Sequence, residues 1–132
     1  MGLLPSYMSE KSINQHVFHR MQRTLPERGI YIQFFRADTD NGVLQLGHLP
    51  VEPAGENWDF KMAELIGVYI SAEKRGLNSQ RLDVAIICPH CGEEVVARFS
   101  VLADWAQQHL DGQLTLDEVV DNVIATQESA EH

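Results

Sequence analysis

The fold is decided by residues 82–101, which read LDVAIICPHCGEEVVARFSV. Two apolar runs rich in β-branched residues, 82–87 and 94–101, flank the short segment Cys88-Pro89-His90-Cys91-Gly92. β-branched residues favour strands, and proline and glycine favour a tight turn. We therefore expect a β-hairpin that carries both cysteines at its tip.

A second hairpin is predicted upstream of the first. Residues 30–37 and 43–49 form two further apolar runs, and they are joined by the segment Asp38-Thr39-Asp40-Asn41-Gly42. Asn-Gly between two such runs is the strongest short-range signal for antiparallel strands.

Two helices are predicted in the first part of the chain. In the first, at about 10–24, apolar residues recur at every fourth position, Ser12 and Gln15 have the spacing of a capping box, and Pro26 is expected to end the helix. The second runs from about Asn57 to Arg75 and is followed by Gly76 as its C-cap.

Two more helices are predicted after the cysteine hairpin. One begins after Ser100 and is ended by Asp111-Gly112. The other is capped by Thr115 and Glu118 and carries an apolar stripe that ends near Ile124.

These elements predict an α+β domain. Because the strands come as hairpins, we expect an antiparallel sheet of two hairpins, about four strands, with about four helices packed mainly on one face. A chain of 132 residues, 44% of them hydrophobic, suits one core, so residues 1–132 are expected to be a single domain, ordered over about 9–126 with frayed ends.

Charge argues against several classes of partner. The formal net charge is −9, and no lysine or arginine follows Arg98. Phosphates would be repelled, so direct binding to nucleic acid is not expected. The acidity serves either solubility or the binding of a protein with a basic surface. The candidate partner-binding residues are Asp104, Asp111, Asp117, Glu118 and Asp121.

The positive charges are gathered mainly in one part of the sequence. Arg20, Arg23 and Arg28 lie near the end of the first predicted helix and form its main basic cluster. Cations near a helix C-terminus interact favourably with the helix dipole.

Location follows from composition. No apolar run approaches the roughly 20 residues of a membrane-spanning helix, and no secretory signal is recognised. Because a chain with two cysteines and no export signal suits a reducing compartment, we expect a cytoplasmic protein without membrane contact.

The motif Cys88-Pro89-His90-Cys91-Gly92, at the tip of a hairpin, resembles one knuckle of a zinc ribbon over about residues 84–99. The resemblance implies Cys88 and Cys91 as two zinc ligands. A tetrahedral site needs four ligands, and no second Cys-x-x-Cys pair exists in the chain. The remaining ligands would come from a second copy in a homodimer or from His16, His19, His48 or His109. The alternative is a turn with reduced thiols and no cofactor.

A redox role for the two thiols is less favoured. A redox-active Cys-x-x-Cys pair sits at a helix N-terminus, where the dipole stabilises the thiolate, whereas a strand is expected after Cys91. The sequence also lacks a glycine-rich phosphate loop, a Gly-x-Ser-x-Gly elbow and a His-Glu-x-x-His helix.

The sequence therefore predicts a small acidic regulatory or interaction protein rather than an enzyme. We expect an inhibitor, or an immunity or anti-defence protein, that occupies the basic, nucleic-acid-binding site of a partner. The first alternative is an adaptor or dimer stabilised by zinc at the Cys88–Cys91 knuckle. The second is a thiol redox enzyme.

Overall fold

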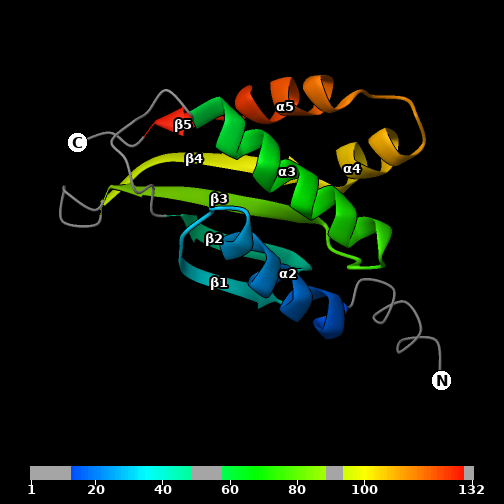
Figure 1. The fold of residues 1–132 in the computed structure, drawn as a ribbon, viewed down its shortest axis with the longest axis horizontal. Helices are drawn as coiled ribbons and strands as arrows, with labels where there is room; N and C mark the ends of the chain where they lie inside the picture. Colours follow the sequence, from blue (N-terminus) through cyan, green and yellow to red (C-terminus); the bar gives the residue numbers. More distant parts are fainter. Residues whose placement is uncertain (1–12, 49–57, 89–93, 130–132) are drawn as a thin grey trace.

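The computed structural model describes residues 13–48, 58–88 and 94–129 (Figure 1). The fold is α+β, as predicted, and the described residues form a five-stranded sheet in the order β1-β2-β3-β4-β5 and four helices. The strands are β1 (Ile32–Asp38), β2 (Val43–His48), β3 (Arg81–Cys88), β4 (Glu94–Leu102) and β5 (Glu128–Ser129). The helices are α2 (Gln15–Glu27), α3 (Trp58–Lys74), α4 (Ala103–Leu110) and α5 (Leu116–Ile124).

Both predicted hairpins are confirmed, but the prediction of a fully antiparallel sheet is wrong. β1 pairs with β2 and β3 pairs with β4 in antiparallel fashion, whereas β2 and β3 are parallel, with Val43 opposite Arg81 and His48 opposite Ile86. The chain leaves β2 at one end of the sheet and returns through α3 to begin β3 at the other end. Such a crossover produces parallel neighbours.

The fifth strand was not predicted. β5 is a two-residue strand that pairs with β4, with Ser129 opposite Ala97 and Glu128 opposite Arg98. β5 lies in the C-terminal segment that was expected to be frayed. It was missed because two residues are too few to show the alternating pattern of a strand.

The first helix differs from its prediction at both ends. Its N-cap is Asn14, whose side chain accepts hydrogen bonds from the backbone N–H groups of His16 and Val17, and the expected cap Ser12 lies outside the described residues. The helix continues through Pro26 to Glu27. Proline near the end of a helix removes a single N–H donor, and here the last turn forms around it.

The predicted C-terminal end of α3 and the predicted start of α5 are confirmed, whereas Asn57, the predicted start of α3, lies outside the described residues. Gly76 has a φ of 93°, and the backbone N–H groups of Gly76 and Leu77 donate to the carbonyls of Glu73 and Ala72, which is the Schellman pattern expected for a glycine C-cap. α5 carries the predicted capping box between Thr115 and Glu118.

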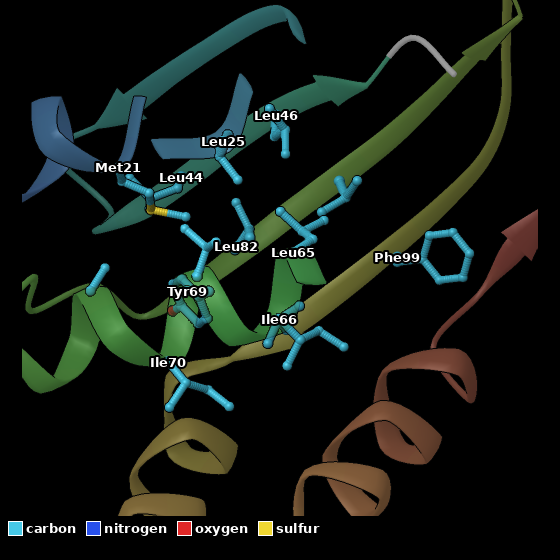
Figure 2. Close-up of a cluster of buried hydrophobic side chains, with 14 of the residues drawn as sticks. Met21, Leu25, Leu44, Leu46, Leu65, Ile66, Tyr69, Ile70, Leu82 and Phe99 are labelled. Carbon is cyan, nitrogen blue, oxygen red and sulfur yellow. The ribbon is translucent and has the colours of Figure 1, made fainter. Parts of the chain in front are cut away.

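One hydrophobic core lies between the helices and one face of the sheet. Alternate strand residues such as Leu44, Leu82 and Val101 are fully buried, and they occupy matching positions on β2, β3 and β4. Figure 2 shows side chains of α2 and α3 meeting those of the strands, among them Leu25 and Tyr69. All four helices contribute buried residues to this core, including Met21, Ile66, Ala106, Val119 and Val123.

On the opposite face of the sheet, the described residues that line the surface come from the strands and from the end of α5 onward. This face forms a shallow hollow of about 940 Å³ bordered by strand residues and by the segment 125–127 that follows α5. Residues that alternate with the core positions, such as Arg36, Gln45 and Asp83, line this hollow. We call it the open sheet face.

Within residues 13–48, 58–88 and 94–129, no helix is both long enough and apolar enough to cross a bilayer.

Candidate functional site

The acidic residues singled out from the sequence lie on two consecutive helices. Asp104, Asp111, Asp117, Glu118 and Asp121 are all exposed, on α4, at its C-cap, or on α5. We call these five residues the acidic helical surface. In the part of the chain that the structure describes, none of the five forms a salt bridge. Among the described residues, no cation therefore forms an ion pair with these carboxylates.

Local helix energetics explains some of these acids but not others. Asp117 and Glu118 lie in the first turn of α5, where the helix dipole favours negative charge, and Glu118 also accepts a hydrogen bond from the backbone N–H of Thr115. Asp111 is the C-cap of α4, and Asp121 lies in the last turn of α5, where the dipole disfavours a carboxylate. Asp121 also follows Asp117 by four residues, a spacing at which like charges repel.

The cysteine turn is only partly described. β3 ends at Cys88, whose side chain is outside the described part, and Cys91 and His90 lie outside it altogether. No group of three histidine, cysteine or acidic residues that could hold a metal occurs among the described residues. Zinc binding by Cys88, Cys91 and a histidine therefore stays a prediction.

The fold separates the four candidate histidines. His48 ends β2 beside Ile86, two residues before Cys88 on the neighbouring strand. It is buried, and its Nδ1 lies 2.7 Å from the carbonyl oxygen of Tyr31. His48 therefore lies at the end of the sheet where the cysteine turn begins.

The other three histidines lie away from that end. His16 and His19 are exposed near the start of α2, where the N–H of Asn14 donates to the carbonyl of Leu77, just before β3. His109 lies on α4, which Figure 1 shows at the end of the sheet opposite the C-terminus of β3. Its Nδ1 is 2.9 Å from the carbonyl oxygen of Leu114.

Elemental analysis of the purified protein tests the zinc interpretation. Zinc held by Cys88, Cys91 and a neighbouring histidine is expected at about one ion per chain, and at half that value if two chains share the site. Replacement of His48 by alanine is then expected to lower the zinc content, whereas replacement of His19 by alanine leaves it unchanged. A zinc content near zero in the unaltered protein contradicts the interpretation.

A buried polar network near the end of α3 was not predicted from the sequence. The Ser79 hydroxyl donates to a carboxylate oxygen of Glu73, and the Tyr69 hydroxyl lies 2.6 Å from the Ser79 Oγ. Because serine has one hydroxyl proton, Tyr69 is the donor in the second bond. Burial, and then the negative charge of Glu73, raise the pKa of Tyr69 far above its usual value near 10.

This network ties the end of α3 to the segment before β3 rather than forming a reactive site. Ser79 is 6% exposed and Tyr69 is fully buried, so a substrate cannot approach either hydroxyl. Asn78, beside Ser79, has a φ of 62°, a value that asparagine adopts more readily than most residues. No pattern in the sequence indicated this contact, because it joins residues through a turn of unusual backbone shape.

The open sheet face carries a second polar network. Arg81 Nε donates to both carboxylate oxygens of Asp83, at 2.9 and 3.1 Å, and Ser100 Oγ donates to Asp83 Oδ1 at 2.9 Å. Arg36 Nε donates to Gln45 Oε1 at 3.2 Å, and its guanidinium lies 4.6 Å from the centre of the Phe34 ring. The polar groups of this face therefore largely satisfy one another.

The fold and these surfaces define a class of protein. It is a small α+β domain with a mixed five-stranded sheet, an acidic helical surface and an open sheet face. Residues 13–132 match the family described as a domain of unknown function (DUF8159), and the chain belongs to that family. No curated protein and no solved structure matches the chain.

Proposed function

We propose that the protein is a non-catalytic binding protein whose acidic helical surface docks on a basic surface of a partner protein. The observation that carries this proposal is the position of Asp111 and Asp121. Both are exposed at helix ends where the dipole disfavours a carboxylate; Asp111 also accepts a hydrogen bond from Gln107 Nε2 at 3.0 Å, whereas Asp121 lies four residues after the like-charged Asp117. A cationic partner would turn this local cost into a favourable interaction.

The surface is suited to a partner site that normally holds nucleic acid. Its carboxylates occupy two neighbouring helices, and no lysine or arginine follows Arg98 in the chain. Such an array presents negative charge in the way that a phosphate backbone does, and matching charge raises the rate and specificity of association. An inhibitory or immunity role, in the cytoplasm, follows as part of the proposal.

The test compares two variants of equal net charge. Asp111→Asn with Asp121→Asn removes the two acids that the dipole disfavours, and Asp40→Asn with Glu27→Gln removes two exposed acids elsewhere. Partners are captured from cell extract on each immobilised protein. The first variant is expected to lose at least about tenfold in affinity, equivalent to about 1.4 kcal/mol, while the control keeps its partner.

Stability and salt provide the controls for this experiment. Removing a carboxylate from a helix C-terminus is expected to stabilise the first variant by about 0.3–1 kcal/mol per residue, so lost binding cannot be ascribed to unfolding. Binding should weaken as salt rises from about 0.1 M to 1 M, because the screening length falls from about 10 to 3 Å. Added DNA or heparin should compete for the partner. Equal capture by both variants, or capture insensitive to salt, contradicts the proposal.

A further inference from the structure

A groove of about 430 Å³ lies between α2 and α3. Its floor contains the buried side chains of Met21, Val68 and Ala72. The exposed arginines Arg20, Arg28 and Arg75, together with the hydroxyl residues Thr24 and Ser71, complete most of its lining. The groove thus combines an apolar floor with a rim of guanidinium groups.

The rim carries an excess of positive charge. Arg28 pairs with Glu64 at 3.4 Å, and Glu27 adds one carboxylate to the lining. Arg20 and Arg75 form no salt bridge in the parts of the chain whose side chains are described. Three of the ten lysines and arginines of a protein of net charge −9 therefore lie around this one groove.

The helix dipole favours two of the three arginines. Arg28 and Arg75 directly follow the last residues of α2 and α3, where the helix dipole favours a cation. Arg20 lies in the middle of α2, where that effect has faded. Arg20 lines the groove, whereas Arg23, which is also exposed on α2, does not.

Gly67 provides an independent observation. It lies inside α3 and lines the groove, and a Cβ built at this position would meet no atom within 4 Å. Gly67 does not have a positive φ, so neither backbone conformation nor close packing calls for glycine. Glycine inside a helix costs about 0.5–1 kcal/mol relative to alanine. Its effect here is to keep the groove open.

We propose that this groove binds a small molecule that carries a phosphate or carboxylate group on a compact apolar body. Guanidinium groups form strong paired hydrogen bonds with such oxyanions, and the floor of Met21, Val68 and Ala72 receives the apolar part. The volume falls within the roughly 300–1,000 Å³ of small-molecule sites. The site is on α2 and α3, so it is independent of the acidic helical surface on α4 and α5.

Phenyl phosphate is a suitable probe, with binding followed by titration calorimetry and by NMR shifts of groove residues. Arg20→Gln and Arg75→Gln are each expected to lower the affinity at least about fivefold, because each removes a charge-assisted contact. Arg23→Gln is the matched control, since Arg23 is exposed on the same helix but does not line the groove. It should bind phenyl phosphate as the unaltered protein does.

Two substitutions of Gly67 separate the folding effect from the binding effect. Gly67→Ala is expected to raise the melting temperature, because alanine favours the helix and its Cβ enters open space. Gly67→Leu extends into the groove and is expected to lower the affinity at least about tenfold while α3 stays folded.

Three results with phenyl phosphate would overturn the proposal. They are the absence of phenyl phosphate binding, an equal loss of affinity in Arg23→Gln and Arg20→Gln, and full binding by a folded Gly67→Leu protein. Phenol supplies the apolar body without the charge. Phenol binding as tight as that of phenyl phosphate would contradict the role of the guanidinium groups.

Discussion

Leu82→Ala is expected to lower the free energy of unfolding by about 2–5 kcal/mol, the range for removing a buried leucine side chain from a core. Leu82 is fully buried on β3, between Leu44 on the parallel strand β2 and Val101 on the antiparallel strand β4. It lies at the junction of the two hairpins, near Tyr69 of α3 (Figure 2). The loss should appear in urea denaturation as a lower midpoint with an unchanged slope.

Leu102→Ala is the matched control. Leu102 ends β4 opposite Arg81 and is only partly buried, so the same substitution removes less contact and leaves less of a cavity. We expect a loss of less than half that of Leu82→Ala. If both variants lose the same free energy, or if Leu82→Ala loses less than about 1 kcal/mol, then Leu82 is not at the centre of the hydrophobic core.

Tyr69→Phe is expected to remove a steep loss of stability at alkaline pH. The pKa of Tyr69 is raised in the folded protein by burial and by the charge of Glu73, so the unfolded chain ionises first. The stability from the neutral phenol is fully present below about pH 10 and is lost as the pH rises above it. In that range Tyr69 alone should lower the free energy of unfolding by about 1.4 kcal/mol per pH unit.

The measurement is urea denaturation of both proteins between about pH 8 and 11.5, a range that spans the ordinary tyrosine pKa. At neutral pH Tyr69→Phe should cost only about 0.5–1.5 kcal/mol, because Ser79 keeps its bond to Glu73. Tyr31→Phe, the same substitution at a side chain that is 51% exposed, is measured in parallel as the control for loss of a tyrosine hydroxyl. If the free energy of unfolding falls equally steeply with pH in the unaltered protein and in Tyr69→Phe, the raised pKa of Tyr69 would be falsified.

Much of the secondary structure follows from local sequence. Asn41-Gly42 marks the first hairpin, Gly76 ends α3, and Thr115 with Glu118 begins α5, as the backbone confirms. Each of these signals acts within a few residues, through a turn or a cap. Local chemistry of this kind is readable without knowledge of the rest of the fold.

Some features of the candidate sites could be predicted from the sequence, and others could not. Exposure of the five acids could be predicted, because charged residues on the polar side of a helix lie outside a core. The groove between α2 and α3 could not, because Arg20 and Arg75 are 55 positions apart, and only the packing of the two helices brings them to one rim. Nor could the sequence tell which histidine shares an end of the sheet with Cys88.

By itself, the sequence determined the α+β class, both hairpins and an acidic final third without lysine or arginine. The tertiary structure decided how the hairpins join, and so made β2 and β3 parallel neighbours at the centre of a five-stranded sheet. Hairpins and caps depend on residues that are close in sequence. The parallel pairing of β2 with β3 depends instead on how the apolar side chains of α3 are buried against these two strands. That burial involves contacts between distant residues, which no local pattern records.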